Sequence, residues 1–75
     1  MPTIPELRWG KFLTQEGLAE LVGVHSRQIS DWETGRYRPS ARNLRRLCEV
    51  LEVGPYDIDW PELKPKDLAG VRPAR

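Results

Sequence analysis

Residues 13–35 read LTQEGLAELVGVHSRQISDWETG, and this stretch decides the fold. After the N-cap candidate Thr14, its first half carries apolar residues at helical spacing: Leu18, Ala19, Leu21 and Val22. Gly23 can adopt a positive φ and end that helix. In the second half, Ile29 and Trp32 stand three residues apart, as on the buried side of another short helix. The stretch therefore predicts two short helices joined by a tight turn.

The flanking residues extend the helical pattern in both directions. Residues 3–6, TIPE, read as a capping box and predict a first helix over about 4–11. Ser40 can cap a fourth helix over roughly 41–52, whose apolar stripe consists of Leu44, Leu47, Cys48 and Leu51. The Gly54-Pro55 pair ends that helix and opens a brief fifth one to about residue 60. Because no alternating strand pattern occurs, the predicted fold class is compact all-α with five helices.

Length and composition limit what the chain can be. Its 75 residues and 8.7 kDa suffice for one small domain, 39% of the residues are hydrophobic, and no large enclosed pocket is expected. A single cysteine cannot form an intrachain disulfide, and neither a signal peptide nor a bilayer-spanning apolar run is visible. We therefore expect a cytoplasmic protein that does not enter a membrane. The domain is expected to cover 1–60, with 61–75 as a Pro-rich tail or linker.

Charge is distributed unevenly although the total is close to neutral. The formal net charge is +1, but residues 26–46 carry six arginines against Asp31 and Glu33, a local net charge of +4. Arginine is suited to bidentate hydrogen bonds with phosphate and with guanine. The pattern indicates a basic face that could meet nucleic acid. A solvated helix face bearing ordinary surface arginines explains it equally well.

The two short helices around Gly23 meet the physical requirements of a helix-turn-helix. If Ile29 and Trp32 bury one side of the second helix, the residues that must point outward are Ser26, Arg27, Ser30 and Asp31. The exposed leading turn of such a helix fits the DNA major groove. Spacing alone is weak evidence, because any small helical bundle contains short turns with glycine.

The residues themselves resemble a known family. Segments 13–24 (LTQEGLAELVGV), 29–35 (ISDWETG) and 38–40 (RPS) are similar to the phage-repressor and Cro type of helix-turn-helix domain, also called XRE-like. The resemblance runs over about 4–60, roughly three quarters of the chain, and its elements fall at the family spacing. It implies a lambda-repressor-like fold, a double-stranded DNA operator as partner, transcription regulation and, commonly, a homodimer on a two-fold related site.

The resemblance also implies which residues meet DNA. Thr14 and Gln15 fall at the start of the second helix, where the family holds a phosphate, and plain helix capping is the alternative. Base contacts are implied for Ser26, Arg27 and Asp31. Backbone contacts are implied for Gln28, Arg36 and Arg38.

Arg27 is the strongest candidate for a specific contact. Its guanidinium can bind O6 and N7 of a guanine and would carry about 1–3 kcal/mol of discrimination. A solvent-facing Arg27 paired with Asp31, four residues on, is the alternative. Asp31 could accept from a cytosine amino group, hold Arg27 in its productive rotamer, or play no part. Three later arginines are interpreted as a solvated face: Arg42, Arg45 and Arg46.

Four further positions are interpreted structurally. Arg8 and Glu33 fall where the family has a partly buried ion pair that links the first helix to the end of the recognition helix. Trp32 is interpreted as core rather than as a stacking platform for bases. Phe12 stands where the family favours glycine, so either Gly10 ends the first helix early or Phe12 accepts an unfavourable backbone.

The predicted function is sequence-specific binding of double-stranded DNA by a transcription regulator, expected to be a repressor, that reads the major groove with the helix at about 26–33. The alternative is a protein–protein interaction module, such as an antitoxin or a polymerase-associated regulator, with DNA binding secondary. The apolar residues expected to serve a partner or a homodimer are Tyr56, Ile58 and Trp60. No catalytic residue, metal site or cofactor is predicted, because no nucleophile with a base, ligand spacing or phosphate-binding loop occurs.

Overall fold

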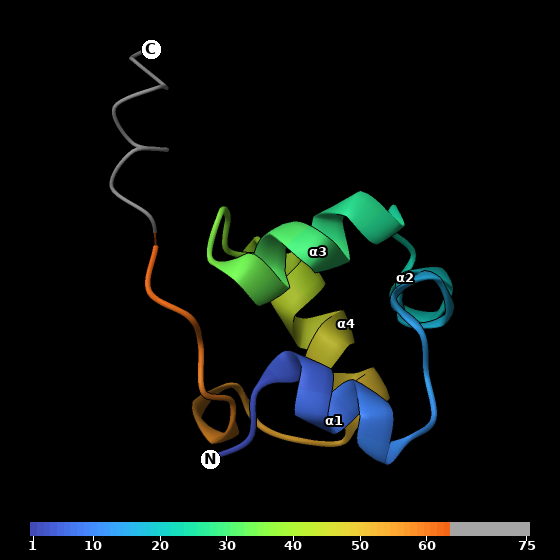
Figure 1. The fold of residues 1–75 in the computed structure, drawn as a ribbon, viewed down its shortest axis with the longest axis horizontal. Coiled ribbons are helices and arrows are strands. Elements are labelled where there is room, and N and C mark those ends of the chain that lie inside the picture. The colour runs from blue at the N-terminus through green and yellow to red at the C-terminus, as the bar shows by residue number, and fades with distance from the viewer. Residues whose placement is uncertain (64–75) are drawn as a thin grey trace, which may run out of the picture.

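The computed structural model describes residues 1–63 and contains four α-helices followed by a single 3-10 turn (Figure 1). The elements, in chain order, are α1 (Ile4–Gly10), α2 (Gln15–Val22), α3 (Ser26–Thr34), α4 (Ala41–Leu51) and η1 (Pro55–Asp57). No strand occurs among the described residues. None of the helices in this part of the chain has the length and hydropathy needed to cross a bilayer. The predicted all-α class is confirmed.

Side-chain caps determine where the helices begin. The Thr3 hydroxyl accepts from the Glu6 backbone N–H, and the Glu6 carboxylate accepts from the Thr3 backbone N–H at 2.8 Å. Thr14 and Ser40 cap α2 and α4 in the same way, each accepting from the N–H three residues on. Each cap satisfies a donor that a helix start otherwise leaves unpaired, and is worth about 1 kcal/mol. The predicted starts of α1, α2 and α4 are confirmed.

Left-handed residues determine where the helices end. Gly23 (φ 91°) closes α2 and Gly35 (φ 84°) closes α3, and glycine adopts this conformation without a Cβ clash. Phe12, just after α1, has φ 58° and is 92% exposed. Both expected consequences of the missing glycine therefore occur, since α1 ends at Gly10 and Phe12 accepts the unfavourable backbone.

The fifth helix is shorter than predicted. Only Pro55–Asp57 forms a helical turn, of 3-10 type, in which the Asp57 carboxylate accepts from the Gly54 backbone N–H at 3.0 Å. Ile58 then has extended dihedrals (φ −111°, ψ 131°). This extension directs the side chain of Ile58 into the core, where it is 2% exposed. Burial of an apolar side chain outweighs the one or two hydrogen bonds that another helical turn would add.

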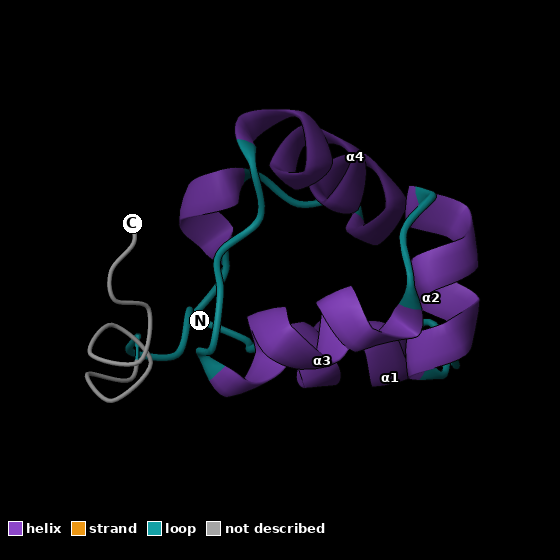
Figure 2. Ribbon diagram, turned by 90° about the horizontal axis from the view of Figure 1, so that it is seen from above, coloured by secondary structure: helices purple, strands orange, loops and turns teal. Residues whose placement is uncertain are grey.

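One apolar core joins all the helices. Figure 2 shows α4 opposite α1 and α3, with α2 at one end of the arrangement. Both α3 and α4 pack against α2, and α1 packs against α3. The buried apolar residues are Ile4, Leu18, Ala19, Val22, Ile29, Trp32, Leu47, Cys48, Leu51 and Ile58. The core thus fixes α3 from one side only.

Residues on either side of position 60, the predicted domain boundary, contact the rest of the described chain. The Asp59 backbone N–H donates to the Pro2 carbonyl at 2.8 Å, which ties the C-terminal segment to the N-terminus. Pro61 and Glu62 then lie against Gly35, which is buried. The predicted tail of 61–75 therefore begins with packed residues, and its remainder, residues 64–75, lies outside the described part of the chain.

Candidate nucleic-acid interface

The helix-turn-helix consists of α2, the turn at residues 23–25 and α3. Ile29 and Trp32 face inward, with 0% and 3% of their surface exposed. Arg27, Asp31 and Thr34 follow one another at spacings of four and three, so they share the opposite side of α3. This outer side is not covered by the rest of the described chain, since Arg27 and Thr34 are exposed and Asp31 is half-buried.

Arg27 is the exposed residue of the first turn of α3 with the longest reach. Within residues 1–63 its guanidinium takes part in no ion pair and no hydrogen bond, and the alternative pairing with Asp31 is not formed. Ser26, one residue before it, is half-buried at the first position of the helix. The donors of Arg27 are therefore free to meet a ligand.

Gln28 helps to fix the start of α3. Its side-chain Oε1 accepts from the His25 backbone N–H at 3.1 Å, which is one half of a capping box. The amide nitrogen of this exposed residue donates to no acceptor within residues 1–63, so both of its donors are available. The three-residue spacing of His25 and Gln28 could have indicated this contact, although histidine is an unusual residue at an N-cap.

The C-terminal end of α3 is held by an ion pair between Arg8 of α1 and Glu33. Arg8 Nε donates to Glu33 Oε2 at 2.8 Å, and Arg8 Nη1 donates to the Leu13 carbonyl at 3.0 Å. The side chains of Arg8 and Glu33 are only 8% and 7% exposed. The structure thus brings together the two residues that the family resemblance pairs. It also ties α1 to α3 and both to the start of α2.

Gln15 belongs to the same network. Its Nε2 donates to Glu33 Oε1 at 2.8 Å, a contact that sequence reasoning missed. The Thr14 hydroxyl accepts from the Gly17 backbone N–H at 2.9 Å and is therefore used as a cap. Glu33 orients the Gln15 amide, whose second N–H has no acceptor within residues 1–63 and lies on the first residue of α2.

The loop after α3 carries two exposed arginines, Arg36 and Arg38. The Arg38 guanidinium lies 5.3 Å from the centroid of the Trp60 ring, and its Nη2 donates to the Pro61 carbonyl at 3.0 Å. A surface groove runs between this loop, α3 and the start of α4, and Gln28, Asp31 and Arg38 are among its lining residues. Asp31 from the outer side of α3 and Arg38 from the following loop therefore line the same groove.

Arg46 has a role that differs from the predicted solvated face. Its Nε donates to the Val22 carbonyl at 2.6 Å, and its guanidinium lies next to Gly23. This carbonyl is one of those that the end of α2 leaves without a helical partner. A cation is also favourable at the negative end of a helix. Arg46 thus stabilises the turn of the helix-turn-helix from α4.

The predicted apolar surface for a partner does not exist as one patch. Ile58, at 2% exposed, belongs to the core and is excluded from any surface. Tyr56 is 89% exposed, and Trp60 is half-buried against Arg38 and the core. The prediction for Ile58 was wrong because the chain leaves its helical conformation after η1, which reverses the direction of this side chain.

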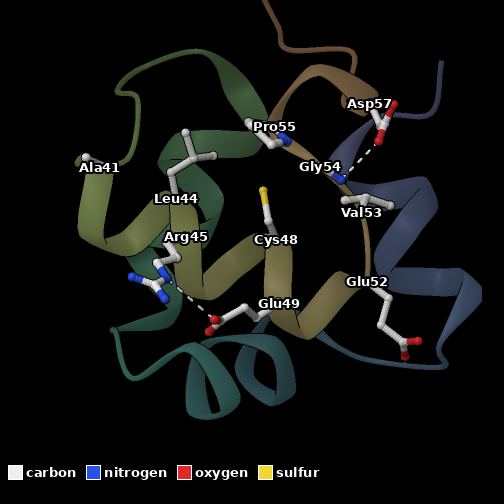
Figure 3. Close-up of a pocket in the computed structure, with 10 residues that line it drawn as sticks. All are labelled: Ala41, Leu44, Arg45, Cys48, Glu49, Glu52, Val53, Gly54, Pro55 and Asp57. Atoms are coloured by element: carbon white, nitrogen blue, oxygen red, sulfur yellow. Dashed lines mark hydrogen bonds and ion pairs between the residues drawn. The ribbon is translucent and has the colours of Figure 1, made fainter.

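A separate groove lies between α4 and the segment 53–57 (Figure 3). Leu44, Cys48 and Pro55 give it an apolar floor, and the Arg45–Glu49 ion pair, 3.6 Å long, lies at its rim. Burial, and secondarily the Asp57 carboxylate, raises the pKa of the Cys48 thiol. A thiol that stays protonated is a poor nucleophile, so the groove offers no activated group. In residues 1–63 no cluster of three or more histidine, cysteine or acidic side chains is arranged to hold a metal ion.

Comparison with known proteins identifies the family to which this geometry belongs. Residues 13–58, more than half of the chain, match the family model described as "Helix-turn-helix". The chain belongs to the helix-turn-helix family. The predicted resemblance to the XRE-like type is confirmed, and the family is one of DNA-binding regulators rather than enzymes.

Two curated proteins are similar to this family member. The "HTH-type transcriptional activator BcrR" of Enterococcus faecalis is 40% identical over 50 residues, which are 67% of this chain and 24% of BcrR. The "Uncharacterized transcriptional regulator in ATPase CF(0) region" of Rhodospirillum rubrum is 36% identical over 64 residues, which are 85% of this chain and 58% of that protein. The chain therefore spans less than two thirds of the length of either relative.

Proposed function

We propose that this chain regulates transcription by sequence-specific binding of double-stranded DNA, with the outer side of α3 in the major groove. One observation carries the proposal: the inner side of α3 is fixed by core packing and the Arg8–Glu33 ion pair, while Arg27 on the outer side has no partner within residues 1–63. A rigid helix that presents free donors is the geometry that direct readout of bases requires. Both relatives carry the word "transcriptional" in their names, which supports the same function.

The residue roles follow from position and hydrogen-bonding capacity. We assign the guanine contact to Arg27, and contacts with neighbouring bases to Ser26 and Asp31. Asp31 accepts only, so its fitting base partner is a cytosine amino group. It lies in the groove beside Gln28, which retains two amide donors for a phosphate or a base.

Phosphate contacts fix the register of the helix on DNA without reading sequence. We assign these contacts to the N-terminus of α2 with Thr14 and Gln15, and to Gln28, Arg36 and Arg38. The free N–H groups of the first turn of α2 form an anion site, and Glu33 directs the Gln15 amide toward it. The local charge of +4 over residues 26–46 supplies the attraction to the duplex.

We propose a homodimer on a two-fold related operator. One module of this kind covers about 600–1,000 Å², which reads a single half-site, and two modules about one helical turn apart multiply the specificity. Of the predicted surface residues, exposed Tyr56 remains available for such an interface. Repression follows where the operator overlaps a promoter, and a reporter assay with the operator in that position tests it against activation, the role in the name of BcrR. The function places the protein with the DNA, in the cytoplasm.

Selection from a random pool of DNA duplexes tests the proposed function. The wild-type protein should enrich one motif, and its binding constant should fall steeply with salt, by about 0.9 in log–log slope for each phosphate contact. Arg27→Ala is the matched variant, because it removes the base contact and touches neither the core nor the ion pair. This variant should keep the circular dichroism of the wild type and enrich a degenerate motif. If the wild-type protein enriches nothing, the proposed function is wrong.

A further inference from the structure

The C-terminal strap, defined as residues 59–62, lies against the loop that follows α3. Figure 1 shows this segment, in orange, on the same side of the molecule as that loop. Glu62 approaches Gly35 so closely that a Cβ there would lie 2.4 Å from the Glu62 carbonyl oxygen. The strap is anchored at its start by the hydrogen bond from Asp59 to Pro2. It is therefore held near both ends, and Arg38 adds a further contact through the Pro61 carbonyl.

Trp60 is the one aromatic residue of the strap, and it contacts Arg38. The ring is fixed by packing on the core and by a hydrogen bond from its Nε1 to the Pro55 carbonyl at 3.4 Å. The Arg38 guanidinium lies over the ring at 5.3 Å from its centroid, and only Nη2 of its nitrogens donates within residues 1–63. A guanidinium stacked on a ring keeps its in-plane donors at Nε and Nη1 accessible.

We propose that Trp60 is a positioning residue for DNA binding, which holds the Arg38 guanidinium in the orientation that meets a phosphate. This inference rests on the proposed function, in which Arg38 contacts the DNA backbone. A free arginine side chain loses rotamer entropy when it is ordered on a ligand, and a stacked one has already lost much of it. Trp60 thus increases affinity without touching DNA.

Arg36 provides the matched control within the same loop. It is exposed, it lies two residues before Arg38, and within residues 1–63 it has neither a side-chain hydrogen bond nor a ring beneath it. Its phosphate contact should therefore form without help from the strap. A substitution of Trp60 should weaken binding through Arg38 and leave the contribution of Arg36 unchanged.

The test measures binding to a labelled duplex of mixed sequence, because phosphate contacts do not depend on sequence. Arg38→Gln should lower the log–log salt slope by about 0.9. Trp60→Leu should weaken binding by about two- to fivefold, the value of an exposed cation–π contact, and Trp60→Phe should restore most of the loss. In the Arg38→Gln background Trp60→Leu should change nothing, whereas in the Arg36→Gln background it should keep its full effect.

Three results would overturn the inference while the proposed function stands. Trp60→Leu could weaken binding equally with and without Arg38, which would show a general structural role. It could tighten binding, which would show that the strap withdraws Arg38 from DNA. Arg38→Gln could leave the salt slope unchanged, which would remove the phosphate contact of Arg38 alone and leave DNA binding by the other assigned residues intact. A wild-type protein that binds no duplex at all refutes the proposed function itself.

A readout without DNA checks the positioning directly. Nuclear magnetic resonance of the wild-type protein should show the side-chain protons of Arg38 shifted upfield by the Trp60 ring current, and those of Arg36 unshifted. Trp60→Leu should abolish the shift while the dispersion of the core resonances stays. Unshifted Arg38 protons in the wild type would refute the stacked orientation, whatever the binding data show.

Discussion

Arg8 and Arg27 carry the same guanidinium in opposite surroundings. Arg8 is buried and donates to both carboxylate oxygens of Glu33 and to the Leu13 carbonyl. Arg27 is exposed and donates to nothing within residues 1–63. A guanidinium whose donors are satisfied inside the fold holds helices together, and one whose donors are free is available to a ligand. The difference separates the residues that stabilise this domain from those that act on its partner.

The same division runs along α3. Its inner side presents Ile29, Trp32 and Glu33 to the core and to Arg8, and its outer side presents Arg27 with the groove-lining Asp31. Substitutions on the inner side should change the free energy of unfolding. Substitutions on the outer side should change DNA affinity alone. The division is wrong if substitutions on either side change both the free energy of unfolding and the DNA affinity.

The largest effect is expected for Arg8→Met. This substitution leaves the Glu33 carboxylate buried beside Gln15 without its cation, and such a loss costs about 3–5 kcal/mol. A small domain has a total stability of only about 5–15 kcal/mol, so urea unfolding followed by circular dichroism should show a much lower midpoint.

The double variant Arg8→Met with Glu33→Met is the control for this prediction. Replacing both charges by apolar side chains of similar length removes the unpaired carboxylate and should recover most of the lost stability. Recovered stability in the double variant would show that Arg8→Met destabilises the fold by leaving the Glu33 carboxylate unpaired. If the double variant is as unstable as Arg8→Met, packing and the hydrogen bond to Leu13 matter more than the ion pair.

A smaller effect, on binding alone, is expected for Arg27→Ala and Arg27→Lys. Loss of a bidentate guanine contact costs about 1–3 kcal/mol of discrimination between the selected motif and the same motif changed at one base pair. Lysine keeps the charge and loses the fork geometry, so Arg27→Lys should retain the salt slope and lose the discrimination. Fluorescence anisotropy at several salt concentrations measures both quantities. Equal discrimination in wild type and Arg27→Lys would show that Arg27 meets only phosphate.

The local features of this fold could be predicted from the sequence. The caps at Thr3, Thr14 and Ser40 and the left-handed glycines at 23 and 35 depend on residues within four positions, so spacing and residue type suffice to locate them. Most of the apolar core positions of α2 to α4 follow from helical periodicity in the same way, although Leu21, which shares the apolar pattern of α2, is 52% exposed.

The contacts that the sequence could not reveal join distant residues. Gln15 meets Glu33 across 18 positions, Arg38 meets Pro61 across 23, and Arg46 meets Val22 across 24. Each donor is a long polar side chain that reads as solvated or DNA-facing when its neighbours alone are considered. Only the packing of α1, α4 and the C-terminal strap brings the acceptors into reach. Ile58 shows the same limit, since one extended residue after η1 decides between surface and core.

A stabilising effect of about 1 kcal/mol is expected for Phe12→Gly. Phe12 occupies the left-handed region at φ 58°, which costs a residue with a Cβ about 1–2 kcal/mol, and its 92% exposed side chain contributes little packing. Glycine can adopt the same left-handed conformation without strain, so the turn should keep its shape. The Leu13 carbonyl should then still accept from Arg8. Thermal unfolding should show a higher midpoint. A lower midpoint would mean that the phenyl ring makes a contact worth more than the strain.

The smallest effect on stability is expected at the carboxylate of Glu6, which is exposed, in contrast to the buried carboxylate of Glu33. The backbone N–H of Thr3, and secondarily its hydroxyl, hold the pKa of the Glu6 carboxyl below its usual range. Because the folded-state pKa lies below the unfolded one, this contribution is complete at a pH above the unfolded value and is lost as the pH falls through the folded value. Glu6→Gln should therefore be slightly less stable than wild type at neutral pH and equal to it in acid.

Glu52 titrates in the same direction, because its hydrogen bond with Lys11 at 2.6 Å and the charge of Lys11 lower the pKa of its carboxyl. Urea unfolding of Glu6→Gln, Glu52→Gln and the wild type across the acid range separates the two groups. Each variant should reduce the decrease in the free energy of unfolding that the wild type shows as the pH falls. The two reductions should be additive, because the sites share no contact. If Glu6→Gln leaves the acid dependence unchanged, the capping box holds α1 through its neutral hydrogen bonds alone.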